Sequence, residues 1–129
     1  MNVILEEWIA KAEGDFNTAQ RELRARHAPN YDSACYHSQQ CAEKYLKAFL
    51  VLQKIEPART HNLIELLKLC VKRDGSFEML RPALELLNVY AVVVRYPRAF
   101  ATKDEARDAV KAMKQVREFV RSKLGKSLR

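Results

Sequence analysis

The sequence predicts an all-α protein, an antiparallel up-and-down bundle of four to five helices. Turn-forming residues are scarce, with 3 Gly and 4 Pro among 129 residues, so the helices should be long. Apolar residues recur at helical spacing along most of the chain. One run, 90–94, has the composition of a strand, but no other segment offers it a partner. The length fits a single domain over residues 1–129.

The first helix is expected over residues 2–26. Its apolar stripe is about 80° wide on a helical wheel. The stripe consists of Leu5, Trp8, Ala12, Phe16, Ala19 and Leu23. The helix should end at 27–30, because the residue before Pro29 resists the α conformation. Asn30 or Asp32 can cap a second helix over about residues 32–53.

The second helix carries a polar strip beside its apolar face. The apolar face contains Ala34, Ser38, Cys41, Tyr45, Phe49 and Leu52. The strip lies within about 80° on the wheel. Its members are His37, Gln40, Lys44 and Lys47. Cations and hydrogen-bonding groups at the border of a core can line a crevice for an anion. The alternative is a solvated edge, where lysine stems cover apolar surface and Glu43 pairs with Lys47.

A connector at 54–60 precedes a shorter third helix. The apolar residues of that helix are Leu63, Leu66, Leu67 and Cys70. Thr60 or His61 can satisfy the free backbone N–H groups at its start. A turn is expected at 74–76.

The fourth helix is expected to start near Leu80, with Pro82 in its first turn. From Leu84 to Val94 it is apolar almost all round. A helix of this kind should be buried on every side. We therefore expect it centrally, or half in the core and half in a dimer interface.

A capping box formed by Thr102 and Glu105 opens the last helix, over about residues 103–124. Its apolar stripe contains Ala106, Ala109, Val110, Met113, Val116, Val120 and Leu124. A basic stripe about 100° away contains Arg107, Lys111, Lys114 and Arg121. The basic stripe is a candidate for phosphate contacts. An exposed face is favoured, because Glu118 interrupts the stripe and aromatic residues are not interleaved. The end, 125–129, is expected to fray.

Charge and composition narrow the function. The formal net charge of +7 favours acidic partners: nucleic acid, a nucleotide or an acidic protein face. No segment resembles a signal peptide and no apolar run approaches a membrane span, so a cytoplasmic protein is expected.

The three cysteines form no CxxC pair, and Cys41 is expected in the core. His27, His37 and His61 show no metal-ligand spacing and no patterned carboxylate partners, so no metal and no cofactor are expected.

Three motifs together resemble the HEPN family, named for higher eukaryotes and prokaryotes nucleotide-binding. They are the segment 37–47 of the second helix, the Thr60-His61-Asn62-Leu63 opening of the third, and Arg95-Tyr96-Pro97 after the fourth. Their order and spacing match over nearly the whole chain. The resemblance implies a homodimeric helical bundle. For small prokaryotic members it implies a separately encoded minimal nucleotidyltransferase as partner, in a toxin–antitoxin-like pair.

The resemblance also bears on enzymatic activity. Some family members are metal-independent ribonucleases, with an Arg followed after four to six residues by a His. Arg95 stands at the expected place, but no His follows it in the chain. Arg21 and His27 have the spacing at the wrong place. No catalytic residue is therefore assigned, and ribonuclease activity is not expected.

The candidate nucleotide- or anion-binding residues are Arg95, Tyr96, His37, Gln40, Lys44, Lys47 and His61. A guanidinium pairs bidentately with an oxyanion, and Tyr96 can stack on a base. Alternatively, Arg95 meets the negative end of a helix dipole and Tyr96 packs. His61 is equally explained by a structural role at the start of the third helix.

Three interpretations follow. The preferred one is a module that binds a nucleotide or a nucleotidyltransferase partner at a cleft between the second helix and Arg95-Tyr96. The second is a degenerate ribonuclease in which His37 or His61 replaces the missing His. The third is a purely structural scaffold whose apolar fourth helix drives dimerisation.

Overall fold

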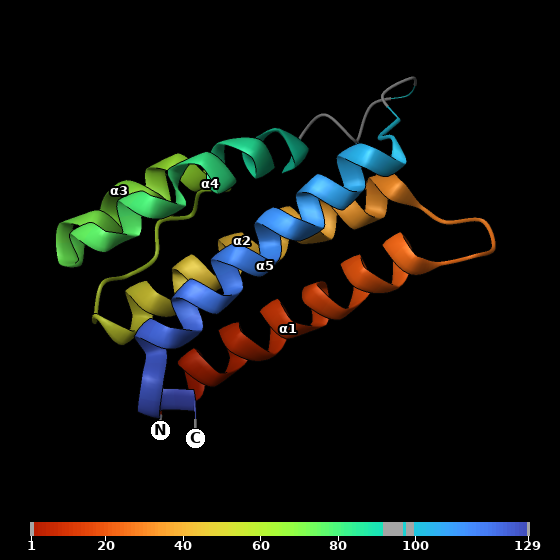
Figure 1. Ribbon diagram of the computed structural model, residues 1–129. Helices are drawn as coiled ribbons and strands as arrows, with labels where there is room; N and C mark the ends of the chain where they lie inside the picture. The colour runs from red at the N-terminus through yellow and green to blue at the C-terminus, as the bar shows by residue number, and fades with distance from the viewer. Residues whose placement is uncertain (1, 92–96, 98–99, 129) are drawn as a thin grey trace.

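The computed structural model describes residues 2–91, 97 and 100–128. It contains α1 (Val3–Arg24), α2 (Tyr31–Leu52), α3 (Leu63–Arg73), α4 (Arg81–Asn88) and α5 (Lys103–Leu124). Short 3-10 helices follow three of them: η1 (Gly75–Leu80), η2 (Val89–Ala91) and η4 (Gly125–Leu128). Figure 1 shows the three long helices side by side, with α3 and α4 as a shorter pair across the bundle from α1. The described chain contains no strand, which confirms the predicted all-α bundle.

Side-chain caps fix the starts of α1, α2, α3 and α5, whereas α4 begins without one and has Pro82 in its first turn. Asn2, Asn30 and Asn62 accept backbone N–H groups at the starts of α1, α2 and α3. Thr102 and Glu105 form the predicted capping box of α5, whose bounds also agree with the prediction. At the start of α2 the cap is Asn30, whereas Asp32 accepts the backbone N–H of Ala101 at 2.6 Å.

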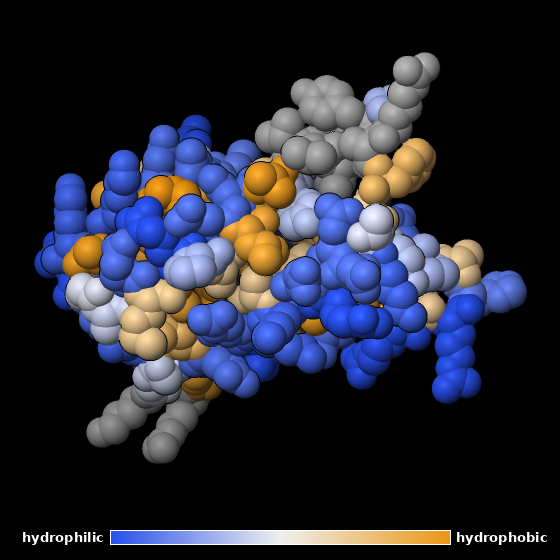
Figure 2. Space-filling view, turned by 45° about the horizontal axis from the view of Figure 1, so that its top comes forward, coloured by the Kyte–Doolittle hydropathy of each residue, from blue (hydrophilic) through white to orange (hydrophobic). Residues whose placement is uncertain are grey.

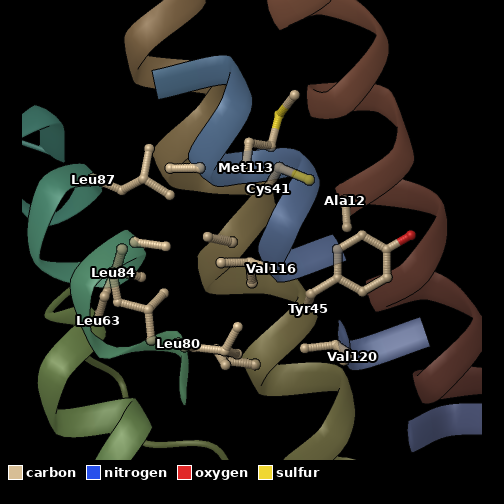
Figure 3. Packing of buried hydrophobic residues seen from close by; sticks show 14 of the residues in the cluster. Ala12, Cys41, Tyr45, Leu63, Leu80, Leu84, Leu87, Met113, Val116 and Val120 are labelled. Atoms are coloured by element: carbon tan, nitrogen blue, oxygen red, sulfur yellow. The ribbon is translucent and has the colours of Figure 1, made fainter. Parts of the chain in front are cut away.

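The core is built around α2, which packs against each of the other four α-helices. Every residue from 45 to 50 is buried. Figure 3 shows Tyr45 and Cys41 of α2 meeting Met113, Val116 and Val120 of α5, with the leucines of α3 and α4 nearby. Burial of each large apolar side chain stabilises the fold by about 1.5–3 kcal/mol. The apolar stripe predicted on α5 is buried along its whole length.

The fourth helix differs from the prediction. The α-helix ends at Asn88, and Leu86 and Val89 are 39% and 51% exposed. It is therefore not buried on every side, and the central helix is α2. The alternative, a helix half in the core and half in an interface, stays a prediction: Leu84 and Leu87 are buried, whereas Leu86 and Val89 face outward. Positions 92–94 of the predicted helix lie outside the described residues.

The surface and the chain end complete the fold. Figure 2 shows a largely hydrophilic face on which some hydrophobic side chains gather. The end was expected to fray, but Gly125–Leu128 forms a 3-10 turn and Leu128 packs against the core. Gly125 supports this turn because its φ of 51° lies in the left-handed region that glycine tolerates. None of the described helices has both the length and the hydropathy of a membrane span.

Candidate functional site

A buried carboxylate of α1 holds two members of the polar strip. Asp15 is only 8% exposed and lies on the same face of α1 as Ala12 and Ala19. Its oxygens lie 2.7 Å from Nδ1 of His37 and 2.5 Å from Nζ of Lys44. His37 and Lys44 lie seven positions apart, about two helical turns, so both can reach one acceptor. This pairing compensates the cost of burying the Asp15 charge.

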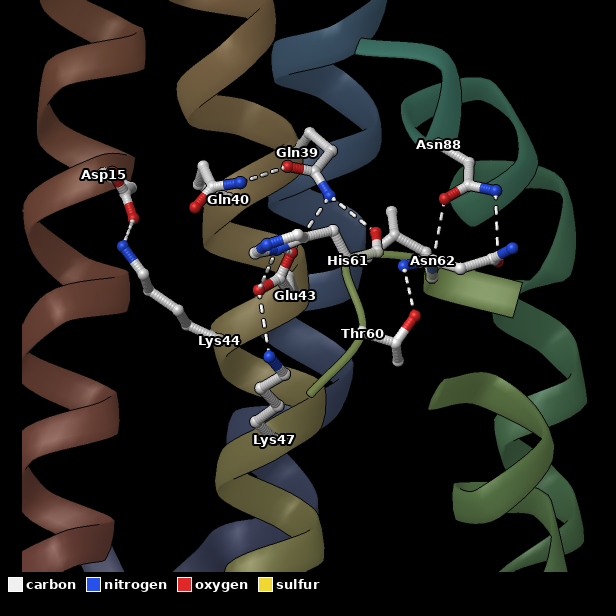
Figure 4. A network of polar contacts seen from close by, with 11 residues as sticks. Asp15, Gln39, Gln40, Glu43, Lys44, Lys47, Thr60, His61, Asn62 and Asn88 are labelled. Atoms are coloured by element: carbon white, nitrogen blue, oxygen red, sulfur yellow. Dashed lines mark hydrogen bonds and ion pairs between the residues drawn. The ribbon is translucent and has the colours of Figure 1, made fainter. Parts of the chain in front are cut away.

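A second buried carboxylate, Glu43, holds the other end of the strip (Figure 4). It accepts hydrogen bonds from Nζ of Lys47 at 3.1 Å and from Nε2 of Gln39 at 3.3 Å, and Nδ1 of His61 lies 3.0 Å away. Gln39 also donates to the carbonyl oxygen of His61 at 3.2 Å and accepts from Gln40 at 2.6 Å. The connector before α3 is thereby tied to α2.

His61 itself is not the cap of α3. Asn62 accepts the N–H groups of Ile64 and Glu65, and Thr60 accepts the N–H of Asn62. The imidazole of His61 stays 69% exposed while one ring nitrogen contacts Glu43. The sequence shows no patterned carboxylate beside the histidines, yet His37 and His61 each contact one, because both partners come from contacts between separate segments.

The structure therefore divides the predicted strip between two carboxylates, and His61 from the connector joins the second of them. His37 and Lys44 meet at Asp15, whereas Lys47 and His61 meet at Glu43; Gln40 joins the second group through Gln39. Asp15 was missed as a site residue, although a charged residue at core spacing on the first helix was the available signal. Arg95 and Tyr96 lie outside the described residues, so their position relative to the strip stays a prediction.

A third polar cluster joins α1, α2 and α5 and was not predicted. Glu13 accepts two hydrogen bonds from Arg117, at 2.7 and 2.8 Å, and one from the Tyr45 hydroxyl. Arg121 donates to the same hydroxyl at 3.0 Å, so one member of the predicted basic stripe faces inward. The Arg117 hydrogen bonds lower the pKa of Glu13 despite its partial burial. Burial is the main cause that raises the pKa of Tyr45, which keeps the phenol protonated.

The thiols offer no activated nucleophile. Cys35, Cys41 and Cys70 are free and buried, which confirms Cys41 as a core residue. Burial raises the pKa of Cys35 and of Cys70 to about 12. Within the described ranges, no three His, Cys, Asp or Glu side chains gather closely enough to hold a metal ion.

Comparison with known proteins extends over nearly the whole bundle. The model of the HEPN domain matches residues 5–123. A protein of Methanocaldococcus jannaschii named "Putative toxin MJ1304" is 30% identical over 138 aligned positions, which cover 92% of this chain and 89% of that protein.

Two solved structures have the same architecture. The crystal structure of TT1696 from Thermus thermophilus superposes with a TM-score of 0.78 at 27% identity, covering 93% of this chain and 98% of that one. ST0689, described as an archaeal HEPN homologue, superposes with a TM-score of 0.76 at 25% identity, covering 93% and 97%. The chain thus belongs to the HEPN domain family.

Proposed function

We propose that this HEPN protein is the toxin-side member of a toxin–antitoxin-like pair whose partner is a separately encoded minimal nucleotidyltransferase. It acts by binding a nucleotide and its partner, not by cutting RNA. The observation that carries this proposal is the similarity to MJ1304, whose name describes a toxin, over 92% of this chain and 89% of that one. The similarity therefore extends over nearly the whole chain and not over one motif alone.

The histidines favour binding over catalysis. No His follows Arg95, so the Arg–His pair of the family's ribonuclease members is absent at its expected place. His37 is held by Asp15 and His61 by Glu43, so the two are engaged by different carboxylates. Both carboxylates belong to networks that connect separate segments of the bundle, which is a structural use of these side chains.

An apolar surface supports a protein partner. Leu86 and Val89 are exposed at the end of α4 and in η2, directly before the segment that leads to Arg95. Exposed apolar residues that lie together commonly mark an interaction surface. This arrangement brings a candidate partner surface and a candidate nucleotide-binding Arg close together in the sequence.

A growth assay with the intact chain tests the proposal. Induced expression in a bacterial host should slow growth, and co-expression of a minimal nucleotidyltransferase from the same source should restore it. Co-expression should not restore growth for the double variant Leu86→Glu/Val89→Glu, because it no longer binds the partner. Co-expression should still restore growth for Lys111→Glu, an exposed change on α5. Unaffected growth at verified expression, together with no complex in size-exclusion chromatography, would overturn the proposal.

A degenerate ribonuclease is a second candidate, favoured by one observation. The exposed His61 imidazole is oriented by the buried Glu43 carboxylate, which is the arrangement of a general base. RNA incubated with the purified protein and a metal chelator tests this reading. Cleavage that is lost in His61→Gln and kept in His27→Gln would support it, and intact RNA would eliminate it.

A further inference from the structure

A groove opens where the start of α1 meets the end of α2 and the connector to α3. Its volume is about 550 Å³. Sites for small molecules commonly have volumes of about 300–1,000 Å³. The described lining extends from Ile4 to Arg59, so it belongs to a different part of the chain than Arg95 and Tyr96.

One wall of the groove is aromatic and apolar. Trp8, which is the only tryptophan of the chain, lines it together with Val51 and Ile55. The Nζ atom of Lys47 lies 5.5 Å from the centre of the Trp8 ring. An indole beside aliphatic side chains is a surface on which a nucleobase can stack, whatever its identity.

The groove also has an excess of positive charge. Lys47, Lys54 and Arg59 line it, against one carboxylate, Glu56. Lys47 is compensated by Glu43, as described above. Among the described residues, no carboxylate lies within ion-pair distance of Lys54 or Arg59. Two cations beside an aromatic wall are complementary to a ligand that is both aromatic and anionic.

The turn at Lys54 shapes the groove at the end of α2. Its φ of 60° lies in the left-handed region, which favours glycine over lysine. The N–H groups of Lys54 and Ile55 donate to carbonyls of Val51 and Leu50 at 3.0 and 2.9 Å, and so fix this turn at the end of α2. This bonding pattern is the Schellman motif, in which a residue of positive φ ends a helix, and it places Lys54 among the residues that line the groove.

From this combination we infer that the groove is a nucleotide-binding site, which we call the Trp8 groove: Trp8, Lys47, Lys54 and Arg59. The base lies against Trp8 and the apolar wall, and the phosphates meet Lys54 and Arg59. This site is additional to the one that the proposed function places beside Arg95. The inference about the Trp8 groove rests on the geometry of the groove alone, so it can be wrong while the proposed function is right.

The single tryptophan makes the test specific. Emission from Trp8, excited at the red edge of indole absorption where nucleotides do not absorb, is followed during titration with ATP, AMP and inorganic pyrophosphate. Saturable quenching is expected with ATP. The double variant Lys54→Gln/Arg59→Gln should weaken ATP binding by roughly tenfold or more, since two charge-assisted contacts are lost. The matched control is Lys111→Gln/Lys114→Gln, which removes the same charge from an exposed face of α5 and should change nothing.

The remaining outcomes separate this inference from the proposed function. No saturable change in Trp8 emission, or equal weakening by both double variants, would overturn the inference. Pyrophosphate that binds as tightly as ATP would also overturn it, because the base would then contribute nothing. Arg95→Ala should leave the Trp8 response intact. Calorimetric ATP binding that depends on Arg95 but does not alter Trp8 emission would sustain the proposed function and reject the groove.

Discussion

At the scale of single residues, buried carboxylates connect the helices of this protein. Asp15 and Glu43 are each almost removed from solvent, and each gathers cationic or hydrogen-bonding partners from another segment of the chain. A buried charge without partners is costly, so these contacts constrain how α1, α2 and the α3 connector are placed. The sequence suggested that Lys44 and Lys47 could bind an anionic ligand, but in the structure they pair with Asp15 and Glu43.

The first prediction concerns Asp15. Asp15→Asn removes the charge that His37 and Lys44 share, and we expect a loss of about 1–3 kcal/mol in the free energy of unfolding. Urea denaturation followed by circular dichroism measures it. Glu118→Gln, an exposed change on α5, serves as the control and should stay within about 0.5 kcal/mol. Equal effects of the two substitutions would mean that the Asp15 contacts contribute no stability.

The second prediction concerns pH. The Arg117 hydrogen bonds lower the pKa of Glu13 below its ordinary value of 4.5 in the folded state. The resulting stability is present above the unfolded pKa and is lost as pH falls through the folded pKa. Unfolding free energy should therefore decline below about pH 5, and this acid decline should be shallower in Glu13→Gln. Urea denaturation of the wild-type protein and Glu13→Gln across this pH range measures the difference. An equal acid decline in both proteins would mean that the Glu13–Arg117 contact does not contribute to it.

At the scale of elements, the last residue of α4 caps the start of α3. The side chain of Asn88, at the end of α4, accepts the N–H of Leu63 at 2.8 Å and donates to Asn62 at 3.3 Å. The N-terminal N–H groups of a helix have no partner within the helix, so a neighbouring helix here supplies one. Asn88, which makes this contact, is also the last residue of α4, although the apolar run of the sequence continues beyond it.

The third prediction follows from this shared cap. Asn88→Ala leaves the N–H of Leu63 without its acceptor and should cost about 1–3 kcal/mol. Asn17→Ala, on an exposed face of α1, should change stability by only a few tenths of a kcal/mol. Thermal unfolding of both variants makes the comparison. Should Asn88→Ala prove as harmless as Asn17→Ala, the cross-helix cap would have no energetic role.

Local signals explain which elements were predictable. For α5, the capping box at Thr102 and the apolar stripe both lie within the helix, and the prediction agrees with the structure. For α4, composition indicated an all-round buried helix, yet Leu86 and Val89 are exposed. An apolar run does not reveal where a side chain such as Asn88 turns to a neighbour, because that depends on tertiary packing.

At the scale of the whole molecule, the same limit applies to the site. The strip on α2 follows from helical periodicity, but its carboxylate partner Asp15 lies 22 residues before His37 and 29 before Lys44 in sequence. Arg117 is 104 residues from Glu13. Such pairs depend on how two helices are aligned against each other, which one sequence does not specify. The Trp8 groove likewise forms only when α1 meets the end of α2.

The fourth prediction concerns assembly. A second copy of the chain is the alternative occupant of the surface that the proposed function assigns to the nucleotidyltransferase. In that case the protein is a dimer at micromolar concentration, and Leu86→Glu/Val89→Glu is a folded monomer. Light scattering coupled to size-exclusion chromatography measures the mass, with circular dichroism as a check of folding. Met79→Glu, an exposed apolar site in η1, is the control. A wild-type monomer would contradict this assignment.

We propose that this HEPN protein binds a nucleotide and does not cut RNA. Calorimetric titration of the purified protein with ATP, GTP and a short RNA tests it most directly, with Arg95→Ala alongside and the RNA inspected afterwards. We expect saturable nucleotide binding that is weakened by roughly tenfold or more in Arg95→Ala, and RNA that stays intact. Absence of saturable binding to all three ligands, or RNA cut by the wild-type protein, would contradict it.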